Sequence, residues 1–203
     1  MDNILITIGT ISDLEQVFAI YESSFPANER HPEQVIMDRI INKTSTLFIA
    51  QEGSVIHGFA LVHDFKDTPF VLLDYLAINS KKRNSGIGSK MLSFLTERHA
   101  VKEKIMIIEA ENPLFGDNKK ERQMRMNFYL KNEASVVNNI NYLLPPLDGT
   151  NPTEMNLLTV PKLMNAFTKA ELINLVKLIY FNIYNRFESD EYYKKTIESI
   201  QSN

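Results

Sequence analysis

The chain has 203 residues, of which 44% are hydrophobic, 10% aromatic and 23% charged. This balance excludes a mainly disordered chain, and the length fits one domain or one domain with an extension. The net charge is −3, so neither a strongly cationic nucleic-acid-binding protein nor a cationic membrane-surface protein is expected. No cysteine is present, which excludes disulfides, thiolate metal ligands and a cysteine nucleophile.

The first part of the chain predicts one strand, two helices and then three strands. Ser12 and Glu15 fit a capping box that opens the first helix, and Pro32 suits the first turn of the second. Alternation of β-branched and apolar runs with polar turns predicts an antiparallel meander after these helices. The expected elements are a strand at 5–8, helices from 12 and from 32, and strands at 46–51, 55–63 and 70–78.

The remaining elements predict an α/β fold with a mixed, mostly antiparallel sheet flanked by helices. A helix is expected to end near residue 100, followed by a strand at 104–109, a helix at 121–132 and strands at 138–144 and 156–160. Beyond about residue 160 only helix is predicted. We therefore expect a domain over 1–160 and a C-terminal helical extension over 161–203.

The extension opens with a second capping box, Thr168 to Glu171, and Ser189 is expected to cap a last helix. The helix over 168–187 is apolar almost all round, which makes a homodimer through the C-terminal helices one possible use of it. Its apolar stretch is broken by polar residues and is too short for a membrane span, and the N-terminus has no basic secretory signal. No membrane partner is expected, and a cytoplasmic location is the default.

The segment from Arg83 to Ser89 is the most informative part of the sequence. It follows a buried strand, opens a helix and contains Gly86 and Gly88, so backbone N–H groups can converge on an anion at the helix N-terminus. It fits neither a Walker A loop nor a dinucleotide-binding fingerprint, because the Gly-Lys pair and the third glycine are missing. An arginine followed by Gly-x-Gly fits a third kind of phosphate loop. An ordinary β–α turn with surface charges is the alternative.

With this loop the chain resembles the GNAT superfamily of N-acetyltransferases, whose acyl-CoA loop has the form Gln/Arg-x-x-Gly-x-Gly/Ala. Residues 72–78 resemble the family's fourth strand, and Phe128 to Asn132 resemble its aromatic-Tyr helix end. The chain departs from the family's Gly-Phe pair, since Glu133 and Ala134 stand there. The resemblance covers residues 1 to about 160 and implies a GNAT-like fold.

The resemblance also implies acetyl-CoA as co-substrate. The pyrophosphate would lie on the loop and the pantetheine would pair with the preceding strand. The implied cofactor-binding residues are Leu76, Ala77, Ile78, Arg83, Asn84, Ser85, Gly86, Ile87, Gly88 and Ser89.

Amine acetylation needs a base to deprotonate the amine and an acid to protonate the departing thiolate. Glu109 and Glu111 lie two residues apart at the end of a strand, so they share a face, and either is a candidate base. Tyr129 matches the position that the family uses as general acid. Solvated strand-end charges and a packing aromatic are the respective alternatives.

The loop between the first two helices is the expected acceptor border. Glu29 could attract a cationic amine and Arg30 could bind a carboxylate, although the sequence favours the plainer explanation of a helix–helix turn with surface charges. The histidines at 57, 63 and 99 show no metal-ligand spacing, so no metal is expected.

Two functions remain open from the sequence. The first is an acyl-CoA-dependent N-acetyltransferase that moves an acetyl group directly to a primary amine, because no cysteine is available for an acetyl-enzyme. The second is a non-catalytic acyl-CoA-binding regulatory module. The acceptor is a small-molecule or peptide amine that loops would select, and its identity is not encoded in any motif.

Overall fold

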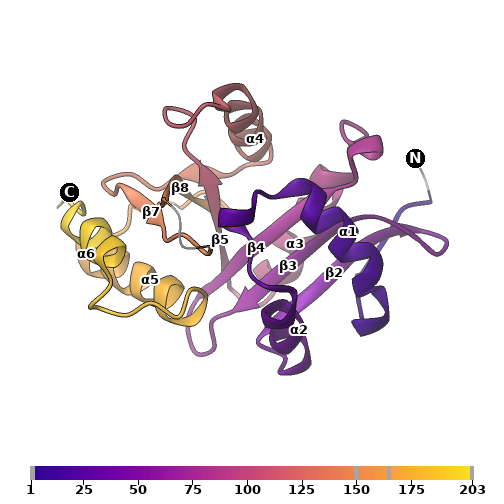
Figure 1. The fold of residues 1–203 in the computed structure, drawn as a ribbon, viewed down its shortest axis with the longest axis horizontal. Helices are drawn as coiled ribbons and strands as arrows, with labels where there is room; N and C mark the ends of the chain where they lie inside the picture. The colour runs from indigo at the N-terminus through magenta and orange to yellow at the C-terminus, as the bar shows by residue number, and fades with distance from the viewer. Residues whose placement is uncertain (1–2, 149–150, 164–165, 202–203) are drawn as a thin grey trace. The chain divides into compact units, whose positions relative to one another are not determined.

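The computed structural model describes residues 3–148, 151–163 and 166–201 (Figure 1). The chain divides into two compact units, Met1–Met106 and Ile107–Asn203, and the boundary falls inside strand β5 (Ile105–Glu111). Within the described ranges there are eight strands, and the pairings β1–β2, β2–β3, β3–β4, β6–β8 and β7–β8 are all antiparallel. This confirms the predicted α/β class with mostly antiparallel strands flanked by helices.

The first unit is an antiparallel meander with helices on both faces. Strand order follows chain order, as expected when short turns join consecutive strands. Its elements are β1 (Leu5–Ile8), α1 (Leu14–Ser24), α2 (Glu33–Ile41), β2 (Ser45–Glu52), β3 (Val55–Asp64), β4 (Phe70–Ile78) and α3 (Ile87–Ala100).

Strand β2 shows why this unit has two layers of helix. Leu47 and Ile49 point into the core that α1 and α2 cover, whereas Phe48 lies between them in sequence and packs its ring against Phe94 of α3, 6.1 Å away. Successive side chains of a strand leave opposite faces, so the consecutive apolar residues at positions 47–50 of β2 require a helix on each side. The loop that links β4 to α3 is thereby held between a buried strand and a buried helix.

The first helix begins differently from the prediction. The capping box lies at Thr10 and Asp13, where the Thr10 N–H donates to the Asp13 carboxylate at 2.7 Å, and not at Ser12 and Glu15. A short 3₁₀ turn over Ile11–Asp13 precedes α1, so the N-cap residue Thr10 lies two residues before the predicted cap at Ser12.

The second unit is built around β8, which neighbours β5 and pairs with two short strands. The predicted strand over 138–144 is wrong in its bounds, because Asn139 adopts a positive φ of 65° and interrupts the extended chain. Its elements are the rest of β5, α4 (Lys119–Lys131), β6 (Ser135–Val136), β7 (Tyr142–Leu144), β8 (Thr153–Val160), α5 (Lys169–Asn182) and α6 (Glu191–Glu198).

The C-terminal helices pack within this second unit. The capping box at Thr168 and Glu171 is confirmed, whereas Asp190, and not Ser189, caps α6 by accepting two backbone N–H groups. No helix in the described ranges is long and apolar enough to cross a membrane. The apolar side of α5 is already buried in the single chain, through Leu172, Leu175, Val176, Ile179 and Tyr180.

Candidate active site

The glycine loop lies between the end of β4 and the start of α3. Gly86 is the N-cap of α3 with φ +82°, and the space where a Cβ would stand is open for 4 Å. No side chain caps this helix, so the N–H groups of its first turn are not satisfied by a cap. Ile87 anchors the turn in the core, whereas Gly88 and Ser89 are half-buried. An uncapped N-terminus beside an open glycine suits an anionic group.

Side chains of the glycine loop stabilise its conformation through hydrogen bonds. The Arg83 guanidinium reaches back, donating from Nε to the Ile78 carbonyl at 3.2 Å and contacting the Ser24 hydroxyl at 3.5 Å. The Ser85 hydroxyl donates to the Lys82 carbonyl at 2.5 Å, and Asn84 takes a positive φ of 61°. Arg83 therefore fixes the loop to the end of β4, and the backbone N–H groups at the start of α3 are left without a side-chain cap.

The strand end before the loop is paired with β3 on one side. Leu76, Ala77 and Ile78 lie opposite Ala60, Phe59 and Gly58. Gly58 is required there, because a Cβ would come within 2.4 Å of the Ile78 side chain and 2.9 Å of the Ala77 carbonyl. The close approach of β3 and β4 at Gly58 therefore fixes the position of the end of β4, from which the loop begins.

Strand β4 carries a bulge at Asp74, a residue that the sequence prediction passed over. Tyr75 pairs with Leu61 and Leu73 with Val62, so Asp74 is the extra residue of the ladder. Its side chain is 4% exposed and pairs with Arg39 of α2 at 3.1 Å. Burial raises the pKa of Asp74 to about 6, against the lowering effect of Arg39. The available signal was a lone aspartate inside an apolar strand, since buried acids are rare unless paired.

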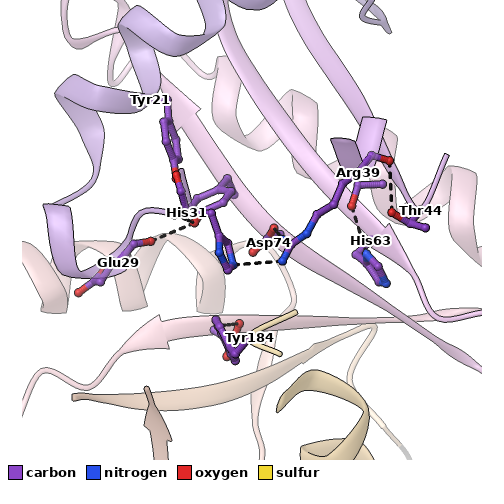
Figure 2. Close-up of polar contacts among 11 residues, drawn as sticks. Tyr21, Glu29, His31, Arg39, Thr44, His63, Asp74 and Tyr184 are labelled. Carbon is purple, nitrogen blue, oxygen red and sulfur yellow. Dashed lines mark hydrogen bonds and ion pairs between the residues drawn. The ribbon is translucent and has the colours of Figure 1, made fainter. Parts of the chain in front are cut away.

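Arg39 also contacts His31, which lies in the loop between α1 and α2 (Figure 2). Its second guanidinium nitrogen lies 3.3 Å from His31 Nε2. A guanidinium can only donate, so Nε2 must accept and His31 is neutral with its proton on Nδ1. Burial and the Arg39 charge lower the pKa of His31 to about 3, in agreement with this neutral form.

The expected acceptor loop is held by the hydroxyls of two tyrosines, of which Figure 2 labels Tyr21. The Tyr75 hydroxyl donates to the Glu29 carbonyl at 3.0 Å, and the Tyr21 hydroxyl donates to the His31 carbonyl at 3.0 Å. Glu29 itself is buried, whereas Arg30 forms a loose ion pair of 3.8 Å with exposed Glu22. The loop is therefore held in one conformation by these hydrogen bonds. Glu29 is buried within it, whereas Arg30 is partly exposed.

In the second unit, Glu111 is held by arginines of α4. Its carboxylate is 3% exposed, lies 3.0 Å from Arg122 Nε and also pairs with Arg125. Arg122 is itself buried and donates from Nε to Asn118 at 2.6 Å. This cluster ties the end of β5 to the first turns of α4, as a structural ion-pair network would.

Glu109, two residues earlier on β5, has tyrosine partners. The Tyr142 hydroxyl donates to one carboxylate oxygen at 2.5 Å, and the Tyr184 hydroxyl donates to the other at 2.6 Å. Burial, and next the Glu109 charge, raise the pKa of Tyr142 well above its usual range. The phenol therefore stays protonated and the carboxylate is the acceptor.

Tyr129 lies on the last turn of α4 beside Phe128, with ring centroids 5.1 Å apart. Burial raises its pKa to about 12, and the nearby Arg125 charge opposes this shift. Its hydroxyl has no hydrogen-bond partner among the described residues, so it can donate to a bound group. Within the same described ranges, no group of three His, Asp or Glu side chains is placed to hold a metal ion.

Together these features describe an α/β protein with an uncapped helix N-terminus and open space at Gly86, and with carboxylates on β5 that are held by phenols or by guanidinium groups. The sequence model of the acetyltransferase (GNAT) family matches residues 14–115, half of the chain. The chain therefore belongs to the GNAT family of acetyltransferases.

Known proteins are similar to this chain over most of its length. YjbC of Bacillus subtilis (strain 168), named as a candidate acetyltransferase, is 24% identical over 181 residues that cover 87% of each chain. A GNAT-family structure from Bacteroides thetaiotaomicron, also named as a candidate acetyltransferase, has a TM-score of 0.72 at 22% identity, covering 89% of this chain and 98% of that one. The yncA structure from Salmonella typhimurium, described with acetyl-CoA, has a TM-score of 0.60 at 13% identity over 82% of this chain and 98% of its own. These likenesses show the GNAT fold.

Proposed function

We propose that the chain transfers the acetyl group of acetyl-CoA directly to a primary amine. The observation that carries this proposal is the uncapped, open N-terminus of α3 behind Gly86, in a chain of the acetyltransferase family. The presence of acetyl-CoA in the yncA structure supports the same co-substrate. Acetyl-CoA supplies the acetyl group as a thioester.

The residues of the first unit fit such a ligand. The backbone from Asn84 to Ser89 receives the pyrophosphate, because helix N–H groups and the helix dipole favour an anion there. Arg83 keeps the loop in place through the Ile78 carbonyl, and exposed Lys81 and Lys82 add positive charge beside it. Backbone groups of residues 76–78 pair with the pantetheine.

Glu109 is the proposed base. As the amine nitrogen forms its bond to the carbonyl carbon and the carbon–sulfur bond breaks, Glu109 takes one proton from the nitrogen. Glu111 is assigned the structural role instead, because both of its oxygens are engaged by guanidinium groups that it would have to release. The (i, i+2) pair of carboxylates is thus proposed to divide into one reactive and one structural member.

Tyr129 is proposed as the donor to the departing sulfur. A tyrosine with a pKa of about 12 is fully protonated at neutral pH, which a general acid requires. Such a phenol is a weaker acid than a thiol of pKa about 8.5, so its main effect is a hydrogen bond to the developing thiolate. Glu29 and Arg30 remain the proposed border of the acceptor site.

The test is acetyl-CoA turnover against a panel of amines, read as release of free coenzyme A. Wild-type protein should release it with at least one amine class. If acetyl-CoA binds and no amine causes release, the chain is a non-catalytic acyl-CoA-binding module and the enzymatic proposal is wrong.

A matched pair of variants tests the loop. Gly86→Ala puts a Cβ on a left-handed backbone inside the loop, and Gly53→Ala does the same in the β2–β3 turn, where φ is +59° and the space is also open. We expect roughly tenfold weaker acetyl-CoA binding for Gly86→Ala and no change for Gly53→Ala. Equal affinities for both variants would contradict the assignment of the loop.

A further inference from the structure

The C-terminal extension supplies a hydrogen-bond donor to Glu109. Tyr184 follows α5, is 7% exposed and donates a hydrogen bond from its hydroxyl to Glu109 Oε2 at 2.6 Å. Tyr142 of β7 occupies the other oxygen at 2.5 Å. Seventy-five residues separate Tyr184 from Glu109, so this contact exists only because the extension folds back within its unit.

The extension is fixed firmly enough to place a hydroxyl. The Tyr180 hydroxyl, one turn before Tyr184, donates to the Leu143 carbonyl of β7. Tyr180 also packs its ring between those of Tyr142 and Tyr184, at centroid distances of 6.0 and 5.9 Å. Farther along, the Ser199 hydroxyl accepts the Asn141 N–H at 2.9 Å. Both tyrosine partners of Glu109 therefore belong to one packed aromatic cluster.

The hydroxyls of Tyr142 and Tyr184 favour the ionised form of Glu109. A protonated phenol on each oxygen stabilises the ionised form of a carboxylate over the neutral form and fixes its plane. The titratable groups of this cluster that face Glu109 are the phenols of Tyr142, Tyr180 and Tyr184. Glu111 pairs with the guanidinium groups of Arg122 and Arg125. These cations hold the carboxylate in place and also offset its negative charge.

We propose that Tyr184 is a positioning residue of the active site, so that the extension orients Glu109 and keeps it ionised for proton abstraction. This role rests on the proposed function of Glu109 as base. It gives the extension a purpose within one chain, independent of any dimer.

The test compares Tyr184→Phe with Tyr193→Phe. Tyr193 is the matched control, since it is another buried tyrosine of the extension and packs its ring against Tyr180 and Phe181. For Tyr184→Phe we expect kcat/KM to fall roughly tenfold, the acidic limb of the pH profile to move to higher pH and the KM for acetyl-CoA to stay unchanged. Tyr193→Phe should change none of these. Tyr142→Phe should shift the acidic limb in the same direction as Tyr184→Phe.

A second measurement keeps the two proposals apart. Carboxyl-carbon NMR with labelled glutamate follows the Glu109 titration directly, assigned by its loss in Glu109→Gln. If wild-type protein turns over no amine, the proposed function fails, and a Glu109 titration that moves up in Tyr184→Phe still supports the positioning contact. If turnover exists and Tyr184→Phe changes neither the pH profile nor the Glu109 titration, the positioning role is wrong.

Discussion

The two glutamates of β5 stand two residues apart and have opposite surroundings. Glu111 sits between the guanidinium groups of Arg122 and Arg125, whereas Glu109 accepts hydrogen bonds from the hydroxyls of Tyr142 and Tyr184. Cations bind a carboxylate by charge, and removing the carboxylate leaves a buried charge without compensation. Phenols leave the negative charge in place, so the carboxylate can still accept a proton.

This difference assigns roles that spacing alone does not. Alternation along a strand makes positions 109 and 111 equivalent, and both looked like candidate bases. The partners come from α4 in one case and from β7 and the extension in the other. A single strand thus carries one carboxylate held by guanidinium groups and one held by phenols, and only the second is proposed to act as the base.

The largest expected effect concerns activity. Glu109→Gln keeps the shape of the side chain and an acceptor for one phenol but removes the base, so turnover should fall about 10²- to 10⁴-fold. Initial rates of coenzyme A release at saturating amine measure this. A larger loss of turnover per folded molecule in Glu111→Gln would reverse the assignment of the two residues.

The second effect concerns stability. Glu111→Gln leaves Arg122, whose side chain is 10% exposed, without its anion, and we expect a loss of about 3–5 kcal/mol in the free energy of unfolding. Urea denaturation followed by circular dichroism gives the value, with Glu109→Gln as the matched control at about 1 kcal/mol. Equal losses in the two variants would remove the contrast.

The third prediction extends the comparison to Asp74, a buried carboxyl with a single arginine. Its pKa is raised to about 6 in the folded state from 3.8, so its favourable contribution is complete below pH 3.8 and is lost as pH rises through 6. The stability of wild type minus that of Asp74→Asn should therefore fall by about 2 kcal/mol between pH 4.5 and 7.5. Urea titrations at both pH values test this, and a difference independent of pH would contradict the raised pKa.

The smallest effect is expected at the exposed side of the Glu111 cluster. Arg125 is 35% exposed, so Arg125→Gln should cost about 1 kcal/mol or less. Arg122→Gln should cost clearly more, because that side chain is buried and also bonded to Asn118. Thermal denaturation of the two variants measures this difference. Each variant removes one positive charge, so equal losses of stability would show that the burial of the arginine does not decide its contribution.

Patterns in the sequence identified the strands, the helices and the glycine loop because each depends on neighbours close in the chain. Boundaries failed where local geometry intervened, as at the 3₁₀ turn before α1 and the positive φ of Asn139. The partners of Glu109, Glu111 and Asp74 could not be predicted, because the contacts join residues up to 75 positions apart. Only the aspartate inside the apolar run of β4 left a visible signal.

The packing of α5 and α6 on β7 also has a consequence for synthesis of the protein. The first unit draws all of its strands and helices from residues before 107, so it can fold while translation continues. The second unit needs Tyr180, Tyr184 and Ser199 before β7 and Glu109 have their partners. We therefore expect a nascent chain to form the β4–α3 glycine loop early and to hold Glu109 in place only after residues 169–200 have been made.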